Sequence, residues 1–482
     1  MNDMKLKPSH NASDRAHDKC GVFAACDSPR AAQDIFLGLH AQQHRGQEGA
    51  GILVSAGPGR NHVHKDHGLV TSVFSDEILE MLTGHFGIGH VRYSTSGHCR
   101  EKDIQPLIAT HRNQVMAVAH NGNITNAGRL KEEMESGGSI FHTSSDTEVV
   151  LHRIVRVDSE SPAEKIRKGL KDVEGAYSMV LKLEDGIAAV RDPLGFRPLH
   201  VGKREEAWFF ASETCAFDII GAEHVCEVKP GEGYIVTGKG LEHFVLDQPV
   251  KPRFCAFELV YFSRPDSSHE SRSIHSYRVE LGRALYEEHP AEADIVTAVP
   301  DSSNSAALGY SAASGIPLDI GLIRSHYTGR TFIAPHQALR DTRVRQKFNV
   351  IRDAVEGKRI VVVDDSIVRG TTCRKIIHLF RENGAKEVHF RVSSPMVANP
   401  CYFGVDMPDR EEFLVNKMPG DMLRQFLGVD SLGFLSPEAL TKVVGSDTCD
   451  ACFTGNYPVK IEDSSGRIKK RKDGPLGKFA YL

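Results

Sequence analysis

Residues 357–372, GKRIVVVDDSIVRGTT, constrain the fold of this chain more than any other segment. The β-branched run at 360–363 predicts a strand buried on both faces of a parallel sheet. Two carboxylates, Asp364 and Asp365, follow where this strand should end, and a helical pattern runs from 374 to 381. Because ligands of open α/β sheets bind beyond the carboxyl ends of the strands, the two acids mark a candidate site.

The loop between this strand and helix is rich in small and hydroxyl residues. Such a loop offers backbone N–H groups and the positive end of a helix dipole to a phosphate group. The two carboxylates can accept hydrogen bonds from sugar hydroxyls or hold a hydrated cation. Paired acidic residues before a helix also occur as simple N-caps, and the Asp pair alone would support that interpretation. The segment lacks GxxxxGK[ST], so it is not a P-loop.

The length of 482 residues exceeds one ordinary core and predicts two domains of roughly 200 residues or more. A net charge of −4, with 25% charged residues, argues against a general surface for nucleic acid or membrane. No apolar run is long enough to span a bilayer, and residues 1–19 lack the apolar core of a secretory signal. Ten cysteines without such a signal indicate a reducing cytoplasm.

The first half of the chain follows a polar leader, residues 1–19. It predicts many short strands with two or three helices, a pattern typical of stacked sheets under helices in an α+β domain. The expected elements are a helix at 31–43 and strands at 176–183, 186–190 and 208–211. The stretch DQPVKPR at 247–253 marks the expected crossing between two domains, 20–250 and 251–459.

The second half alternates helical and strand patterns, which predicts a doubly wound parallel sheet. The expected elements are helices at 273–288 and from about 303, and strands at 294–299, 318–322 and 387–393. A polar, Arg-rich segment at 324–347 is expected to be a mobile loop. The tail, 460–482, carries the basic run 469–472, which is most simply a solvated extension rather than a nucleic-acid site.

Cys20 is the best candidate nucleophile of the first half, because a thiol is reactive near neutral pH. Cleavage of the bond before Cys20 would free an α-amine with an ordinary pKa of about 7.7–8.0, within reach of its own thiol. One residue would then supply both nucleophile and base. Residue pattern alone leaves open the commoner alternative, a buried inert thiol at the start of a strand.

Five segments of the first half, in this order, resemble the glutamine amidotransferase domain of the N-terminal-nucleophile hydrolases: CGVFA, HRGQEGAGI, GHVRYSTSG, AHNGNITN and SSDTEV. The segment VVVDDSIVRGTT resembles the phosphoribosylpyrophosphate (PRPP) motif of the type I phosphoribosyltransferases. Together they make the chain similar to the amidophosphoribosyltransferase family over nearly its whole length after residue 19. The resemblance implies an αββα sandwich followed by an α/β domain with a parallel sheet. It also implies an enzyme that makes 5-phosphoribosylamine from PRPP and glutamine in purine synthesis.

The resemblance assigns roles to residues of the first half. Cys20 would form a γ-glutamyl thioester after removal of the leader, and Asn121 and Gly122 would form the oxyanion hole. Arg92 would bind the α-carboxylate of glutamine, a bidentate task that suits a guanidinium. Asp146 would hold the α-ammonium. Four further residues are expected to be scaffold around this site: His44, Arg45, Gln47 and Glu48. Taken alone, Asn121-Gly122 is also a common turn dipeptide.

In the second half, Asp364 and Asp365 would accept from the ribose hydroxyls, and Mg²⁺, held with them and with Ser302, would neutralise the leaving pyrophosphate. The residues expected to cradle the 5-phosphate are Ser366, Arg369, Gly370, Thr371 and Thr372. Lys347 and the segment GRTFI at 329–333 belong to the region that closes over PRPP in this family. Closure would exclude water and complete an apolar path for ammonia from Cys20.

Cys449 and Cys452 form a C-x₂-C pair, a spacing that lets two thiolates bind one metal or cluster edge. Cys255 and Cys401 stand far away in sequence. From the residues alone, zinc, a [4Fe–4S] cluster and reduced thiols without a metal remain open. Members of the family with similar segments carry a [4Fe–4S] cluster on these four positions, so the resemblance favours the cluster.

Two functions of other classes are consistent with parts of the sequence. A PRPP-sensing regulator would not need Cys20, Arg92, Asn121 and Asp146 together, and an electron-transfer iron–sulfur protein would need neither of the other motif sets. The resemblance further implies a homotetramer inhibited by purine nucleotides, with glutamine and PRPP as substrates and no nucleic-acid or membrane partner.

Overall fold

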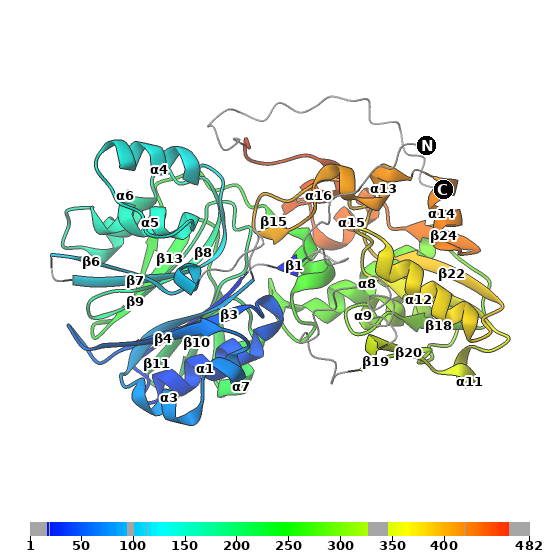
Figure 1. Cartoon of the computed structure of the whole chain (residues 1–482), viewed down its shortest axis with the longest axis horizontal. Coiled ribbons are helices and arrows are strands. Elements are labelled where there is room, and N and C mark those ends of the chain that lie inside the picture. The colour runs from blue at the N-terminus through cyan, green and yellow to red at the C-terminus, as the bar shows by residue number, and fades with distance from the viewer. Residues whose placement is uncertain are drawn as a thin grey trace, which may run out of the picture.

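The computed structural model describes residues 17–18, 20–93, 101–112, 114–325, 346–418 and 420–461. Two lobes lie side by side, the first formed by the N-terminal half of the chain and the second by the C-terminal half (Figure 1). The expected loop at 324–347 and the basic tail at 469–472 lie almost entirely outside the described residues.

The first lobe contains two stacked antiparallel sheets. The seven-stranded sheet has the order β12-β10-β11-β2-β5-β3-β4, and the six-stranded sheet has the order β14-β13-β9-β8-β7-β6. The strands of the first sheet are β2 (Cys20–Cys26), β3 (Gly49–Ser55), β4 (Asn61–His67), β5 (Phe86–Arg92), β10 (His200–Arg204), β11 (Ala207–Ala211) and β12 (Glu223–Glu227). Those of the second are β6 (Leu107–His111), β7 (Gln114–Ile124), β8 (Gly175–Lys182), β9 (Gly186–Arg191), β13 (Glu232–Thr237) and β14 (Gly240–Val245).

Helices cover the outer faces of both sheets, so the first lobe is an αββα sandwich (Figure 1). On the first sheet lie α1 (Ala31–Ala41), α2 (Val70–Val73), α3 (Asp76–Met81) and α7 (Cys215–Ile220). On the second lie α4 (Ala127–Ser136), α5 (Asp146–Val155) and α6 (Pro162–Leu170). Successive side chains of a strand point to opposite faces, and β2 uses both: Phe23 packs under the helices, whereas Val22 and Ala24 pack between the sheets.

The second lobe is built on a parallel sheet with the order β18-β21-β22-β24. Its strands are β18 (Ile295–Ala298), β21 (Arg359–Asp364), β22 (Glu387–Val392) and β24 (Ser431–Phe434), and its longer helices are α8 (Ile274–Glu288), α9 (Asn304–Ser314) and α12 (Thr371–Glu382). The β-branched residues of β21 are fully buried, as their sequence predicts for a central parallel strand. The α/β class expected for this half is therefore confirmed.

Smaller elements surround this sheet. They are the pairs β15 (Phe254–Cys255) with β25 (Thr448–Cys449), β16 (Ser268–His269) with β17 (Arg272–Ser273), β19 (Leu322–Arg324) with β20 (Phe348–Val350), and β1 (His17–Asp18) with β23 (Val405–Asp406). The short helices are α11 (Arg352–Val355), α13 (Leu414–Lys417), α14 (Asp421–Leu427), α15 (Pro437–Val444) and α16 (Ala451–Thr454). Within the described ranges, none of the helices combines the length and apolarity that crossing a bilayer requires.

Two expectations for this half are corrected by the structure. The expected strand at 318–322 is wrong: Leu318 makes a single bridge with Val296, and the next strand, β19, begins at Leu322 and pairs antiparallel with β20. The apolar side chains of Leu318 and Ile320 are exposed, so they were not marking a buried strand. Helix α12 begins at Thr371 rather than at 374, because Gly370 adopts a left-handed conformation that starts the helix earlier.

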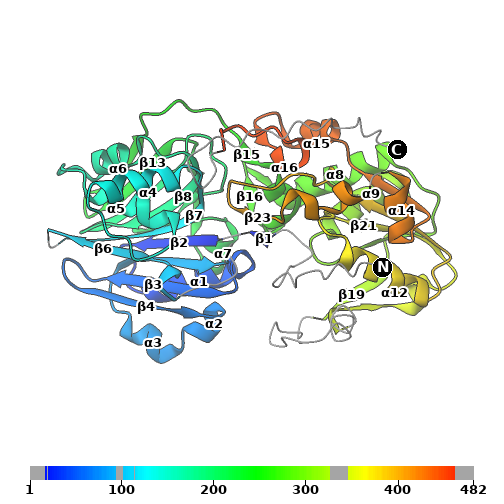
Figure 2. The same cartoon turned by 45° about the horizontal axis from the view of Figure 1, so that its top comes forward.

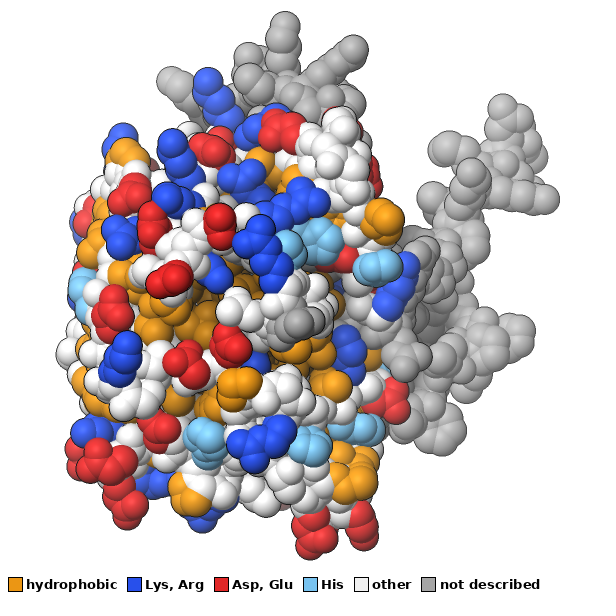
Figure 3. Space-filling view, turned by 90° about the vertical axis from the view of Figure 1, so that its left-hand side faces the viewer, with side chains coloured by type: hydrophobic (Ala, Val, Ile, Leu, Met, Phe, Trp, Pro, Cys, Tyr) orange, Lys and Arg blue, Asp and Glu red, His pale blue; other side chains and the backbone are white. Residues whose placement is uncertain are grey.

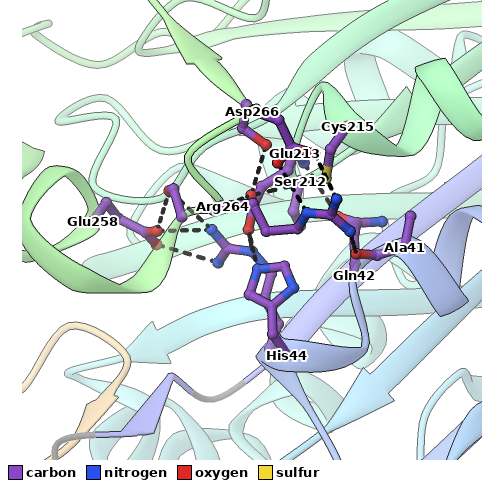
Figure 4. Close-up of polar contacts among 12 residues, drawn as sticks. Ala41, Gln42, His44, Ser212, Glu213, Cys215, Glu258, Arg264 and Asp266 are labelled. Carbon is purple, nitrogen blue, oxygen red and sulfur yellow. Dashed lines mark hydrogen bonds and ion pairs between the residues drawn. The ribbon is translucent and has the colours of Figure 1, made fainter. Parts of the chain in front are cut away.

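A buried ionic network joins the two lobes (Figure 4). Arg45, in the 3₁₀ turn Gln43–Arg45 of the first lobe, donates Nη2 to Glu258 Oε2 of the second lobe at 2.7 Å. The Nε of the same guanidinium donates to Glu213, whose carboxylate also accepts from His44 Nε2 at 2.6 Å and from the backbone N–H of Arg264 at 2.8 Å. Glu258 begins a π-helical turn, Glu258–Phe262. Charges buried on both sides of the interface therefore compensate one another.

Candidate active sites

Cys20 is the first residue of β2 and lies in the middle of the first sheet. It pairs with Arg92, the last residue of β5, and Arg92 pairs on its other side with Gly49 of β3. The thiol residue is only 7% exposed. The sheet register therefore brings the expected nucleophile and the expected carboxylate-binding guanidinium to neighbouring positions at one end of the sheet.

The segment expected to form the oxyanion hole lies on β7, in the facing sheet. Strand β7 packs against β2, and Asn121 is fully buried, with no hydrogen-bond partner for either polar atom of its amide among the described residues. A buried amide without partners is costly unless a ligand completes it. Gly122 has φ +152°, and a Cβ there would meet Ala176 O at 2.0 Å, so only glycine fits this close approach.

Asp146 is the first residue of α5, and its Oδ2 accepts from the backbone N–H of Ile124 at 2.8 Å, two residues beyond Gly122. The structure thus ties the expected ammonium-binding carboxylate to the end of β7. A residue that the sequence did not single out, Asp103, links the two candidate glutamine ligands. Its carbonyl accepts from Arg92 Nη1 at 2.6 Å, and its buried carboxylate accepts from Ser144 N at 3.3 Å, just before α5.

The four expected scaffold residues do different things. Arg45 and His44 belong to the ionic network between the lobes, and a Cβ on Gly21 would lie 3.3 Å from Arg45 Cδ, so this side chain packs directly beside the nucleophile strand. The backbone N–H of Glu48 donates to Arg92 O at 3.0 Å. Gln47 lies in the loop between the 3₁₀ turn and β3.

A segment of the second lobe contacts the oxyanion strand. Asn123 Nδ2 donates to Tyr402 O at 2.9 Å, and a Cβ on Gly404 would lie 3.1 Å from Gly122 Cα. Beside them the rings of Phe196 and Phe403, one from each lobe, stack with centroids 4.2 Å apart. The first candidate site is therefore bordered by both lobes, which sequence motifs confined to one half could not indicate.

The second candidate site lies at the carboxyl end of the parallel sheet. Asp364 ends β21 and Asp365 follows it, and both side chains are buried. Two serines of the loop after β18 hydrogen-bond to them: Ser302 Oγ donates to Asp365 Oδ2 at 2.5 Å and Ser303 Oγ donates to Asp364 Oδ1 at 3.2 Å. The structure thus brings Ser302 to Asp365, one of the two aspartates with which the resemblance would have it hold Mg²⁺.

The expected phosphate cradle forms the turn between β21 and α12. Ser366 Oγ donates to Asp365 Oδ1 at 2.6 Å, and Gly370, Thr371 and Thr372 form the start of α12, the end of a helix that favours an anion. Gly370 has φ +74°, and a Cβ there would meet Leu414 Cδ2 at 2.2 Å. Glycine is therefore required both by conformation and by space.

Two expected PRPP ligands lie at the edge of this site. Arg369 pairs with Glu412, its Nη2 lying 2.9 Å from Oε2 of that carboxylate. Lys347 is exposed at the start of the β20 segment, and its Nζ lies 5.5 Å from the centre of the Phe348 ring. The segment at 329–333 lies outside the described residues.

Arg278 of α8 lies between the ionic network and the acidic pair, and the sequence did not single it out. Its buried guanidinium donates Nε to Leu259 O within the π-helical turn at 3.0 Å and Nη2 to Ser263 O just after the turn at 2.7 Å. Burial lowers the pKa of Arg278 to about 10, and the negative charge of Asp365 opposes this effect. One cation therefore interacts with both the interface turn and Asp365 of the candidate PRPP site.

Four cysteines expected to bind a metal or cluster line one small cavity: Cys255, Cys401, Cys449 and Cys452. The cavity is otherwise lined by aromatic and aliphatic side chains, including Phe403 and Val405. Burial raises the pKa of Cys255 to about 12, with a smaller opposing effect from Arg197, and burial raises the pKa of Cys449 and Cys452 well above the ordinary value. These thiols would need added positive charge nearby to ionise.

The four cysteines share one cavity, but they do not form a preassembled metal site. In the part of the chain that the structure describes, no group of three or more His, Cys, Asp or Glu side chains converges closely enough to hold one metal ion. The four sulfurs instead surround a cavity, and the backbone N–H of Phe403 lies 3.3 Å from Cys401 Sγ, a contact typical of cluster sulfur ligands.

The outer face of the first lobe carries Lys, Arg, Asp and Glu side chains interspersed with one another (Figure 3). On this face no broad area of one charge sign is present among the described residues.

Comparison with known proteins agrees with this geometry. A family model described as a glutamine amidotransferase domain matches residues 90–218. A chloroplastic amidophosphoribosyltransferase of Arabidopsis thaliana is 49% identical over 98% of this chain and 85% of its own length. The amidophosphoribosyltransferase of Bacillus subtilis is 46% identical over 92% of this chain and 95% of its own. That of Methanothermobacter thermautotrophicus is 44% identical over 92% of this chain and 95% of its own.

Solved structures match both lobes together. A glutamine PRPP amidotransferase from B. subtilis, in complex with ADP and GMP, superposes with a TM-score of 0.87 at 45% identity, covering 92% of this chain and 98% of that one. A structure titled as the allosteric regulatory enzyme of purine biosynthesis superposes with a TM-score of 0.88 at 46% identity, covering 92% and 97%. Fold and sites thus define a glutaminase sandwich joined to a phosphoribosyltransferase domain. The chain belongs to the amidophosphoribosyltransferase family.

Proposed function

We propose that this enzyme hydrolyses glutamine at Cys20 and transfers the ammonia to C1 of PRPP, giving 5-phosphoribosylamine, glutamate and pyrophosphate. The observation that carries the proposal is the buried Asn121 amide, which has no partner among the described residues and lies on the strand that packs against β2. We assign residues 20–250 to the glutaminase domain and 251–459 to the phosphoribosyltransferase domain.

At the first site, removal of residues 1–19 frees the α-amine of Cys20, which takes the thiol proton. The sulfur attacks the carboxamide carbon of glutamine, and the negative charge on its oxygen is stabilised by the Asn121 amide and the Gly122 N–H. The C–N bond breaks as ammonia leaves with a proton, and water then hydrolyses the thioester to glutamate. Arg92 and Asp146 hold the substrate by its α-carboxylate and α-ammonium.

At the second site, departure of pyrophosphate builds positive charge on the ribose ring, which the carboxylates of Asp364 and Asp365 stabilise. These carboxylates also suit Mg²⁺, which takes one or two protein carboxylates and completes its coordination with phosphate and water. The hydrogen bond from Ser302 Oγ to Asp365 supports Ser302 as a further residue of this site, and bound Mg²⁺ would supply charge neutralisation to the leaving group. The residues from Ser366 to Thr372 and Lys347 bind the phosphates.

We further propose a [4Fe–4S] cluster on the four cavity cysteines. When bound, the cluster supplies the positive charge that lets four buried thiols act as thiolates. Its expected contribution is structural, because the cavity lies beside the interface ring stack of Phe196 and Phe403 rather than at either set of substrate ligands. The nine cysteines within the described ranges are free of disulfides, which supports a reducing, cytoplasmic location.

Feedback inhibition by purine nucleotides and assembly as a homotetramer are also proposed. The first is supported by the ADP and GMP complex of the B. subtilis relative. Dose–response curves for AMP, ADP and GMP, together with the mass of the assembly in solution, measure both properties.

Intact mass and metal content of anaerobically purified protein test processing and cluster together. The expected result is a chain that begins at Cys20 and contains iron and sulfide. An active enzyme that retains residues 1–19 would contradict the role of the α-amine, and zinc as the sole metal would contradict the cluster. Separately, Asp364→Asn with Asp365→Asn should abolish phosphoribosylamine formation while sparing basal glutaminase activity, and unchanged synthesis would contradict the PRPP site.

A further inference from the structure

The leader is joined to the second lobe by backbone pairing. Strand β1, His17–Asp18, pairs antiparallel with β23, Val405–Asp406, with His17 opposite Asp406 and Asp18 opposite Val405. Figure 2 shows β1 and β23 together between the two lobes. A segment that is removed from the mature enzyme thus has a defined partner far along the chain.

The backbone on the other side of the cleavage bond is anchored as well. Cys20 begins β2 and is held in the first sheet by its pairing with Arg92. Only one residue separates Asp18 from Cys20, so the Cα atoms of these two residues lie at most about 7 Å apart. The bond before Cys20 is therefore flanked by two strands, one anchored in each lobe.

The partner strand of the leader continues directly from the segment that borders the glutaminase site. Tyr402 accepts from Asn123, and Gly404 packs on Gly122, immediately before β23. One short stretch of the second lobe, 402–406, therefore contacts both the oxyanion strand and the leader.

We propose that residues 402–406 are a docking strand for the leader, which holds the bond before Cys20 next to the Asn121–Gly122 segment until it is cut. This inference rests on the proposed N-terminal nucleophile. The occupant is the leader of the same chain, and recognition is by backbone, so it requires strand geometry at positions 17 and 18 rather than particular side chains.

The shortness of the pairing suits this task. Two paired residues form few net hydrogen bonds, each weak in water, yet the pairing is favoured while the leader is covalently attached, because attachment gives a high effective concentration. Cleavage removes that advantage, so the freed leader dissociates and leaves the site open to glutamine.

Hydrogen exchange tests the docking without any cleavage. The full chain carrying Cys20→Ala, with retention of its leader checked by intact mass, is compared with a Cys20→Ala chain that starts at residue 20. Peptides covering Val405 and Asp406 should exchange more slowly in the full chain, and His17→Pro with Asp18→Pro should remove this protection. Equal exchange in all three proteins would overturn the proposal.

The rate of leader loss, followed by mass spectrometry, tests the role in processing. In the chain with native Cys20, His17→Pro with Asp18→Pro removes both backbone donors and should slow cleavage about tenfold or more. His17→Ala with Asp18→Ala keeps the donors and should leave the rate within about threefold of wild type. The docking proposal fails if the Ala pair slows cleavage as much as the Pro pair, or if neither pair slows it.

Different results would contradict the proposed nucleophile and the docking strand. An unsubstituted chain that keeps its leader and is fully active would contradict the proposed nucleophile, whatever the exchange result. A chain that loses its leader at the same rate with and without the Pro pair would contradict only the docking strand. The mature enzyme is identical in both leader variants once cut, so its glutaminase activity serves as an internal control.

Discussion

Neutralising Glu258 should destabilise the contact between the lobes. Its fully buried carboxylate accepts from Arg45 of the first lobe at 2.7 Å, from Arg197 at 2.9 Å and from Ser263 Oγ at 2.7 Å. The substitution Glu258→Gln keeps the side-chain volume but leaves two buried guanidinium groups short of one negative charge. Because removing one partner of a buried ion pair costs about 3–5 kcal/mol, Glu258→Gln should lower the unfolding free energy by this amount.

Urea unfolding and thermal unfolding measure the loss of stability in the variant. The single tryptophan, Trp208 on β11, reports the first lobe by fluorescence, and circular dichroism reports both lobes. For a lobe of roughly 200 residues, a loss of 3–5 kcal/mol corresponds to a fall in melting temperature of about 6–20 °C. The matched control is Glu356→Gln, which breaks the exposed pair with Arg352 and is expected to leave the midpoint unchanged.

The pH dependence gives a second check on the same variant. Burial acts to raise the pKa of Glu258, but Arg197 and Arg45 outweigh it and hold the pKa at about 2. A carboxyl with a depressed pKa contributes stability that is present above its unfolded pKa of about 4.3 and is lost as pH falls toward the folded value. The difference between wild type and Glu258→Gln should therefore stay constant from pH 8 to 5 and narrow below. The prediction is refuted if Glu258→Gln lowers the unfolding free energy no more than Glu356→Gln does. It is also refuted if the difference in unfolding free energy between wild type and Glu258→Gln narrows already above pH 5.

Three further predictions concern single sites. Asn121→Ala should lower glutaminase kcat by about 10²–10³-fold with little change in melting temperature, because its amide has no hydrogen-bond partner among the described residues; a large loss of stability with normal kcat would contradict the oxyanion role. Gly370→Ala should weaken PRPP binding, measured by isothermal titration, and lower stability, measured by thermal unfolding, more than Gly315→Ala does. Both glycines have φ near +74°, but only at position 370 would the added Cβ clash with Leu414. Burial lowers the pKa of His200 to about 3, so its contribution to stability is lost as pH falls below about 6.5. The unfolding free energy of wild type minus that of His200→Asn should therefore shrink between pH 7 and 5, by at most about 1.4 kcal/mol per pH unit, and a difference that grows would contradict this prediction.

Local patterns predicted those parts of the fold in which neighbours in sequence are neighbours in space. Strand β21, the acid pair and the glycine that starts α12 form one contiguous segment, so buried apolar residues and turn chemistry specify them together. The expected start of α12 was three residues too late because Thr371 and Thr372 are residue types common in loops. The left-handed conformation of Gly370, which the sequence does not show, ends the loop before them. The strand expected at 318–322 failed because an apolar run does not reveal whether it is buried.

Contacts between distant segments could not be predicted from residue patterns. Arg45 and Glu258 meet only because two lobes pack together, and nothing in their local sequence marks either as a partner. The four cysteines were identified as a set by resemblance, but their arrangement around one cavity is a tertiary property. Asp103 contacts Arg92 through its backbone carbonyl, which every residue possesses, so no residue type could signal this contact.

The ionic network also limits how this enzyme can be recombined. Arg45 comes from the first lobe and its partner Glu258 from the second, so a chimera that joins this glutaminase to an unrelated phosphoribosyltransferase would leave the buried Arg45 with Glu213 but without Glu258. Transplanting the turn Glu258–Phe262 together with the first lobe would restore the pair. The modular unit that can be exchanged between proteins therefore does not end at the linker after β14 but extends at least to Ser263, which also binds Glu258.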